Sequence, residues 1–508
     1  MSATLQTVHV RINDNATGQP TPCRVRFTGP DGTYYAPFGR LTEFATGRNQ
    51  DVGGNLKLGM KPYAYIDGTC EIGLPVGNVH IDVSKGPEFT PLQLEVPIGP
   101  GKLAIRLTIE RWIDKRKGGW HSGDTRCHFL APHAALLEAQ AEDLAVVDLL
   151  ACSCQIPSSH GQMASSITNI HAFSGQAPSL EVPGHKVVVN THNTHPVLGN
   201  LGLLNCHRAV YPLSFGGSGE LDYWTMADWC DQCHRKRGLV IWTKTNHESA
   251  GFRYGEPLAD LILGKVDAFE IDAFEDSPFD VLSDWYDLLN CGFAVPLVGA
   301  SGKENNGIAL GSMRTYARLR PGEALTYKTW IEAIRAGRTF ATNGPLLSFH
   351  VEGNDIGSSI RIPHAGDRIR FKAEAQSLVP FDVLEIVANG QVVAKADSQG
   401  SGSSTCLQGD LSIEANTWLA ARCRGQQQLL HRPANQRVFV HTSPVYVQIE
   451  GQAPAAPANL VASFGKQLDE MISWARTQAR CETEKQRERL VDIFGAAKEE
   501  LERRAPRH

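Results

Sequence analysis

The chain has 508 residues, of which 42% are hydrophobic and 20% are charged, a composition typical of globular proteins. Its length exceeds that of one ordinary domain and predicts about three domains. The formal net charge is −5, from 49 basic and 54 acidic residues, so neither nucleic acid nor an anionic membrane surface is expected as a partner.

The N-terminal residues and the cysteines predict the cellular compartment of the protein. Residues 1–15 contain no basic stretch followed by an apolar core, so no secretory signal is predicted. No apolar run approaches the ~20 residues needed to cross a bilayer. The 12 cysteines are scattered along the chain, which is typical of reduced thiols in a cytosol. We expect a cytoplasmic protein whose partner is a small-molecule substrate or an anionic ligand; the oligomeric state stays open.

Residues 1–112 alternate between apolar and polar positions in short stretches such as TVHVRI, CRVRF and NVHIDV. Turn signals such as Pro30-Asp31-Gly32 separate these stretches. Two packed sheets would bury the apolar face of each strand, so an N-terminal β-sandwich is predicted, without a catalytic role.

In residues 113–345 the sequence pattern changes and predicts strands that alternate with helices. Near-continuous apolar runs such as AVVDLLAC, KVVVN, LVIWT and VDAFEI are separated by helix-like stretches such as DYWTMADWCDQCHRKR. Such runs are typical of parallel strands buried on both faces. The order and length favour an α/β barrel over a doubly wound sheet, since no GxGxxG turn follows an early strand.

Residues 346–450 return to β-patterning, with Asn389-Gly390 as a strong hairpin signal, and predict a C-terminal β-sandwich. The stretch 451–459 reads as a linker. Residues 460–508 show apolar residues at helical spacing and predict a helical segment that packs on the rest of the chain; a partner-binding arm is the alternative.

Polar side chains follow the apolar runs of the central region. Because functional groups of a barrel gather at the carboxyl ends of its strands, these residues are candidates for one site, although loop and cap positions also attract polar residues. The candidates are Asp124, Arg126, His128, Asn190, His192, His195, Lys244, His247, Glu270, Asp272, Ser301 and Lys303.

The stretch WHSGDTRCH (120–128) resembles the G-D-x-H-x-H opening of the PHP (polymerase and histidinol phosphatase) superfamily, and more closely its CehA/McbA-like metallohydrolase branch. WYDLLNCGFAVPLVGAS (285–301), MRTYARL (313–319), AIRAGRTFATNGPLL (333–347) and HTSPVYVQIEG (441–451) resemble the same branch. The resemblance covers about residues 5 to 500. It implies a PHP-type, distorted TIM-like α/β barrel between two β-sandwiches, and metal-assisted hydrolysis of an ester, amide, carbamate or phosphoester bond.

The chain departs from the family pattern at the implied metal ligands. The opening motif of the family supplies two histidines, whereas this chain has Arg126 and His128. Lys244-Thr245 stands where the family has His-Pro, and Ser301 lies where an Asp is usual. Asn190 takes the place of a Glu. His128 retains one histidine of the opening motif, and His195 and Glu270 match a further family His and Glu.

The replacements weaken a metal site. A guanidinium only donates hydrogen bonds, so Arg126 cannot ligate, and Lys244 could do so only when deprotonated. The resemblance then leaves one divalent metal (Zn, Mn or Fe) on His128, His195 and Glu270, with His247 as a displaced substitute, or no metal at all.

Two functions remain open from the sequence. In a hydrolase, Asp124 or Glu270 would act as base or ligand, while Arg126 and Lys244 would stabilise an anionic transition state. In a pseudoenzyme, Arg126, Lys244 and Lys303 would hold the carboxylate, phosphate or sulfate group of a small molecule, or the protein would serve as a scaffold. The alternative role of Arg126 is to pair with Asp124 or Glu270 and fill the vacated metal space.

Two cysteine patterns are set aside. Cys230-x-x-Cys233-His234 matches a haem-attachment pattern but lies in a predicted amphipathic helix, so structural packing is expected. Cys127 lies between two site candidates on a strand, where alternate residues face opposite ways, and is expected to point away from the site.

Overall fold

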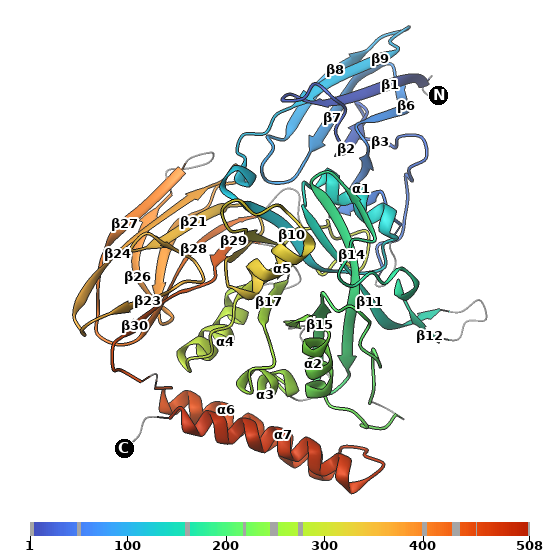
Figure 1. Cartoon of the computed structure of the whole chain (residues 1–508). Coiled ribbons are helices and arrows are strands. Elements are labelled where there is room, and N and C mark those ends of the chain that lie inside the picture. The colour runs from blue at the N-terminus through green and yellow to red at the C-terminus, as the bar shows by residue number, and fades with distance from the viewer. Residues whose placement is uncertain are drawn as a thin grey trace.

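The structure is a computed structural model that describes residues 5–47, 52–157, 163–216, 220–243, 252–272, 278–398, 404–428, 437–453 and 455–505. The fold is mixed α/β, with mostly strands in several sheets (Figure 1). None of the helices in these ranges is long and apolar enough to cross a membrane.

Two sheets form the N-terminal part, at the top of Figure 1. Their strand orders are β6–β1–β9 and β4–β5–β2–β7–β8, with β3 beside β2. Apolar side chains from both sheets, among them Val8, Val25 and Ile81, share one buried core, as in a sandwich. The strands are β1 (Leu5–Asp14), β2 (Cys23–Thr28), β3 (Tyr34–Tyr35), β4 (Asn55–Leu58), β5 (Lys61–Ile66), β6 (Thr69–Pro75), β7 (Gly77–Ser84), β8 (Leu92–Ile98) and β9 (Ala104–Ile109).

The central part contains two runs of parallel strands. β10, β11 and β14 are parallel, as are β16, β17 and β18, and the antiparallel strand β15 joins the two runs. The strands are β10 (Trp120–Cys127), β11 (Val146–Pro157), β12 (Met163–Ile167), β13 (Leu180–Val182), β14 (His185–His195), β15 (Gly199–Leu204), β16 (Leu239–Thr243), β17 (Ala268–Asp272), β18 (Leu297–Ala300), β19 (Arg314–Arg318) and β20 (Thr339–Thr342).

These ladders do not form a closed barrel among the described strands. The end of β10 reaches the chain after β18 only through an isolated parallel bridge between Cys127 and Lys303. Two backbone hydrogen bonds accompany it, from His128 N to Lys303 O (2.7 Å) and from Gly302 N to Arg126 O (3.1 Å). The start of β10 pairs instead with the antiparallel strand β19.

The C-terminal strands form two sheets over a shared apolar core. One sheet has the order β22–β21–β24–β27; the other contains the remaining strands and continues the central sheet through the pairing of β20 with β29. The strands are β21 (Leu346–Val351), β22 (Asn354–Asp355), β23 (Ser359–Ile362), β24 (Asp367–Gln376), β25 (Val383–Ala388), β26 (Gln391–Asp397), β27 (Ser404–Ile413), β28 (Thr417–Gln428), β29 (Arg437–Thr442) and β30 (Val445–Ile449).

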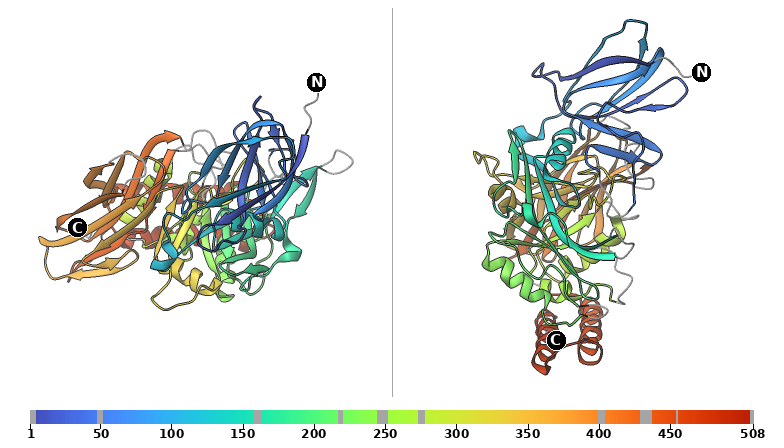
Figure 2. Two further views of the ribbon diagram at one scale, coloured as in Figure 1. Left: turned by 90° about the horizontal axis from the view of Figure 1, so that it is seen from above. Right: turned by 90° about the vertical axis from the view of Figure 1, so that its right-hand side faces the viewer.

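The last two helices form a hairpin along the bottom of Figure 1, at the opposite end of the molecule from the N-terminal sheets (Figure 2). Leu468 and Phe494 are buried in a core shared with α2, α3 and α4, so the hairpin packs on the chain. The helices are α1 (Pro132–Ala141), α2 (Met226–Arg235), α3 (Glu256–Ile262), α4 (Pro278–Asn290), α5 (Tyr327–Arg335), α6 (Ala458–Thr477) and α7 (Glu484–Arg503).

The strand β14 is longer than the apolar run KVVVN indicates. His192 follows this apolar run and would be expected in a loop, but it lies on the strand, because β14 continues to His195. The extension pairs with β15 from Thr191↔Leu203 to His195↔Gly199. A polar stretch can therefore be a strand when a neighbouring strand satisfies its backbone groups.

Candidate functional site

Arg126 joins two carboxylates inside the central part. Its Nε donates to Glu270 Oε1 (2.7 Å) and its Nη2 donates to Asp272 Oδ2 (2.7 Å). All three side chains are buried. Burial alone would lower the pKa of Arg126, but the two carboxylates raise it above its ordinary value, so the guanidinium stays charged. Burial raises the pKa of Glu270 to about 7, although Arg126 opposes that shift.

The alternation of strand residues brings these groups together. On β17, Ala268 belongs to an inner apolar cluster with Val146 and Val298, whereas Phe269 packs outward among the helices. Because side chains alternate along a strand, Glu270 and Asp272 continue the inner face beyond Ala268. Arg126 meets both carboxylates there.

Asp124 lies beside this group but does not pair with the Arg126 guanidinium. Its Oδ1 accepts from the backbone N–H groups of Arg126 (3.2 Å) and Ser301 (3.0 Å), and its Oδ2 accepts from Gly311 N (2.8 Å). Burial raises the pKa of Asp124, and the hydrogen bonds oppose that change. Of the two partners expected for Arg126, only Glu270 forms an ion pair, and Asp272 is the second partner.

His128 and His192 lie next to each other, with ring centroids 5.2 Å apart. His128 Nδ1 is 3.2 Å from Leu150 O; since a carbonyl only accepts, Nδ1 carries the hydrogen and the lone pair is on Nε2. Burial and the charge of Arg126 lower the pKa of His128 to about 3, so this ring is neutral at pH 7. His192 Nε2 lies 3.0 Å from Thr243 Oγ1.

His195 lies apart from this group, because it is three residues after His192 on the same strand and so faces the other side. Its Nδ1 accepts from the backbone N–H groups of Val197 (3.1 Å) and Leu198 (2.9 Å), which leaves Nε2 to donate to Asp222 Oδ1 (2.9 Å). Both ring nitrogens are engaged, so His195 offers no lone pair to a metal ion in this arrangement.

Two predicted site residues, Lys244 and His247, lie outside the described residues. Lys303 lies near β10, but its Nζ donates to Asn305 O (3.1 Å) and Ile308 O (3.0 Å) and is 3.7 Å from Glu138 Oε2. Its charge is therefore directed toward α1 and the loop carbonyls.

Sequence reasoning missed a buried polar group on the inner face of β11. Asp148 Oδ1 accepts from Tyr327 Oη (2.6 Å) and Asn190 Nδ2 (3.1 Å). Burial raises the pKa of Asp148 to about 8. The single Asp inside the apolar run AVVDLLAC could have predicted this group, because a buried carboxyl needs hydrogen-bond partners.

The resemblance implies a divalent metal, and the donor set tests whether one fits. Glu270 is held by Arg126, and His195 has no lone pair available. Within the described ranges, no group of three or more His, Cys, Asp or Glu side chains is arranged to hold a metal ion. The guanidinium of Arg126 also places a permanent positive charge beside Glu270 and Asp272, and this charge would repel a dication there. The described residues therefore do not fit the implied metal.

The cysteines have packing roles in the described structure. Cys127 faces away from Arg126 and is buried among side chains of α1 and β11. Cys233 on α2 contacts Cys206, with 3.3 Å between the two sulfur atoms, and Cys230 Sγ is 3.7 Å from Asp260 Oδ2. Burial raises the pKa of Cys127, Cys230 and Cys233 well above the ordinary thiol value.

Neither the protein-family models nor the curated proteins contain a match to this sequence.

Proposed function

We propose that this chain is a PHP-like protein that has exchanged metal-dependent hydrolysis for the binding of an anionic small molecule. The resemblance around residues 120–128 supports the ancestry. The two runs of parallel strands and the Cys127–Lys303 bridge are what a distorted, incompletely closed barrel of this type would present.

The pairing of Arg126 with Glu270 and Asp272 carries this proposal. In a metal-dependent site, such carboxylates would offer lone pairs to the ion or to a water molecule. Here they accept from a guanidinium, and the pair is removed from water. Displacing Arg126 would break two buried ion pairs, which typically costs about 3–5 kcal/mol.

Arg126 itself is not the anion-binding group in this proposal. Among the described residues, two carboxylates face one guanidinium, so these three side chains together carry no surplus positive charge for a ligand. The charge of Lys303 is likewise directed to carbonyl oxygens and to Glu138. An anionic ligand would need a different positive site.

One observation favours the hydrolase alternative. His128 has its Nε2 lone pair available in the arrangement described, and His192 is its neighbour. Two adjacent imidazoles can be part of a metal site when further donors approach.

Hydrolysis assays distinguish the two functions. We would measure the hydrolysis of p-nitrophenyl acetate, p-nitrophenyl phosphate and a p-nitrophenyl carbamate with added Zn²⁺, Mn²⁺ or Fe²⁺. The proposal expects no metal-stimulated turnover, and the same background rate for the wild type and Glu270→Gln. Metal-dependent turnover that Glu270→Gln abolishes would overturn it and establish the hydrolase.

A further inference from the structure

A cavity of about 700 Å³ lies where the N-terminal sheets, the central part and the C-terminal sheets meet. Its walls come from β2, the end of β7, the chain between β7 and β8 with the start of β8, and the turn between α1 and β11. The segment that leads into β19, the turn between β20 and β21, and the loop between β24 and β25 complete them. This volume suits a small molecule. The cavity is separate from the Arg126 group, and all of its lining residues are described.

Arg314 contributes a buried positive charge to this cavity without a carboxylate partner in the described structure. It is 2% exposed. Its Nε donates to Gly311 O (2.8 Å) and its Nη1 donates to Glu142 O (2.9 Å), both of them neutral carbonyl oxygens. Buried arginines are normally paired with an anion, because an uncompensated charge away from water is costly. The arrangement therefore lacks a counter-charge.

Two residues that line the cavity each contain a buried polar atom without a hydrogen-bond partner in the described ranges: Nε of Arg24 and Oγ of Ser312. Arg24 is 5% exposed and Ser312 is 3% exposed. Arg24 uses Nη1 for an ion pair with Glu142, which leaves its Nε donor unused. Buried polar atoms without partners are rare, and two at one cavity indicate a group that completes their hydrogen bonds.

The charges of the lining residues agree with an anion. Arg24 and Arg314 supply two positive charges and Glu142 supplies one negative charge, so one positive charge is in excess. The lining also includes apolar residues, among them Phe89, Leu378 and Pro380. We infer that the cavity binds a small molecule with one carboxylate on an apolar body, the carboxylate being held by Arg314, Arg24 and Ser312.

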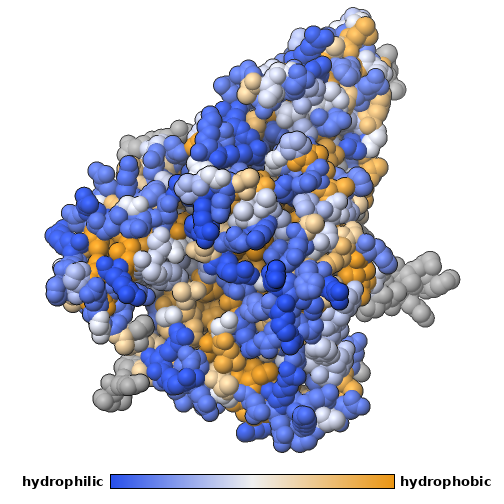
Figure 3. All heavy atoms as spheres, in the orientation of Figure 1, coloured by the Kyte–Doolittle hydropathy of each residue, from blue (hydrophilic) through white to orange (hydrophobic). Residues whose placement is uncertain are grey.

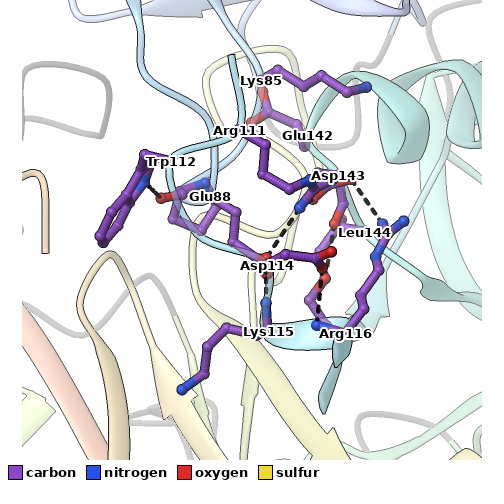
Figure 4. Close-up of polar contacts among 12 residues, drawn as sticks. Lys85, Glu88, Arg111, Trp112, Asp114, Lys115, Arg116, Glu142, Asp143 and Leu144 are labelled. Carbon is purple, nitrogen blue, oxygen red and sulfur yellow. Dashed lines mark hydrogen bonds and ion pairs between the residues drawn. The ribbon is translucent and has the colours of Figure 1, made fainter. Parts of the chain in front are cut away.

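Ion pairs hold together the segments around the cavity, so we expect the site to have the same shape without a ligand. Figure 4 shows Arg111 and Arg116 pointing toward Asp143, at 2.8 and 2.7 Å, and Arg111 also reaches Glu88 at 3.0 Å. These groups fix the N-terminal sheets against the turn that carries Glu142. A preformed site loses less free energy to ordering when it binds.

The segment before β19 connects this cavity to the Arg126 group. Ser312 lines the cavity, and the N–H group of its neighbour Gly311 holds Asp124, which lies two residues before Arg126. The inference deepens the proposed function, since it gives the anionic ligand a location. It rests on that function only for the statement that the ligand is bound and not hydrolysed.

Calorimetric titration with 4-phenylbutyrate tests the inference, with 4-phenylbutan-1-ol as the uncharged control of the same body and acetate as the carboxylate alone. The full chain should bind 4-phenylbutyrate at one site per chain and bind acetate and the alcohol at least tenfold more weakly, because only the first offers both charge and apolar surface. Ser312→Ala should weaken binding about threefold to tenfold, the loss expected for one hydrogen bond.

Two variants locate the binding site. Arg314→Gln should abolish saturable binding, and Leu378→Trp, which fills the mouth from a half-buried position, should do so without removing a charge. Val392→Trp, on an exposed strand outside the cavity lining, should bind like the wild type. The circular dichroism spectrum of each variant must match that of the wild type.

Failure of 4-phenylbutyrate to bind would overturn the inference, as would binding that is unchanged in both Arg314→Gln and Leu378→Trp. Equal affinity for the acid and the alcohol would also overturn it, because the anionic head would then play no part. None of these results depends on metal content or turnover, so they are distinguishable from a failure of the proposed function.

Discussion

Arg126 donates from Nε and Nη2 to two carboxylates on β17, and all three side chains are buried together. At the scale of single residues, this pairing decides how the site can act. A histidine in the same position would offer a lone pair, whereas arginine supplies charge and donors only. Asp148 is a second buried carboxyl group of this kind, because burial raises its pKa to about 8.

Replacing Arg126 with Met should lower the free energy of unfolding by about 3–5 kcal/mol at pH 8, because it would break the buried ion pairs with Glu270 and Asp272. The loss should be smaller at pH 5, since a Glu270 pKa that is already raised to about 7 favours the protonated form below that pH. Urea unfolding at both pH values measures this. Arg370→Met, which removes an exposed partner of Glu352, is the control and should not change stability. A loss that is independent of pH would contradict the ionic account.

Replacing Asp148 with Asn should stabilise the protein relative to the wild type as the pH rises from 5 to 8. The raised pKa of Asp148 means that its contribution is present below the ordinary carboxyl pKa and is lost as the pH rises through about 8. Asparagine keeps the Oδ1 acceptor for Tyr327 and Asn190 and does not titrate. The difference should grow by at most roughly 1.4 kcal/mol per pH unit.

Urea midpoints at pH 5, 6.5 and 8 measure this difference. Asp397→Asn, on the exposed end of β26, is the matched control and should show no such trend. If Asp148→Asn and the wild type change in parallel over this range, the buried carboxyl is ionised and its assignment is wrong.

At the scale of elements, the extension of β14 decides which histidines meet. His192 faces His128, whereas His195, an odd number of residues later, faces Asp222. His195 also contacts Phe215 and lies against Trp474 of α6, with ring centroids 4.7 and 6.3 Å away. His192 therefore belongs to the candidate site, whereas His195 packs against the C-terminal helix α6.

Replacing His195 with Ala should lower the free energy of unfolding by about 2–4 kcal/mol, because it removes aromatic packing and leaves Asp222 with fewer hydrogen bonds. Thr194→Ala, at the neighbouring half-buried position, should cost less than 1 kcal/mol by the usual range for such sites. Thermal unfolding followed by circular dichroism measures both. Unchanged stability in His195→Ala would mean that this histidine has no structural role, and would reopen its assignment as a metal ligand.

At the scale of the whole molecule, both groups of buried charged residues discussed above lie where separate strands or sheets meet. The Arg126 group lies where β10 meets β17, and the cavity of Arg314 lies where three groups of strands meet. The face shown in Figure 3 is mostly hydrophilic, with hydrophobic residues in separate groups. The proposals for function therefore rest on the buried Arg126 group and on the Arg314 cavity, and not on this surface.

The sequence predicted some of this organisation and not the rest, for physical reasons. Apolar runs and turn signals predicted the parallel strands and the outer sheets, because they reflect local burial and backbone preference. Arg126 was a candidate because polar residues follow the buried strands, and the resemblance of one motif placed it where the family has a metal ligand. Its second partner Asp272 could not be chosen from sequence, since that depends on how two strands lie together. The Arg314 cavity combines segments far apart in the chain, so no local pattern could indicate it.

The metal content of the purified chain shows whether Arg126 has replaced a metal ion. The protein would be expressed with added Zn, Mn and Fe, purified without chelators, and analysed by mass spectrometry of the elements, beside Arg126→His. The account predicts far less than one metal ion per wild-type chain, because Arg126 occupies Glu270 and Asp272. One tightly held ion per wild-type chain, lost on replacing His128, would contradict it.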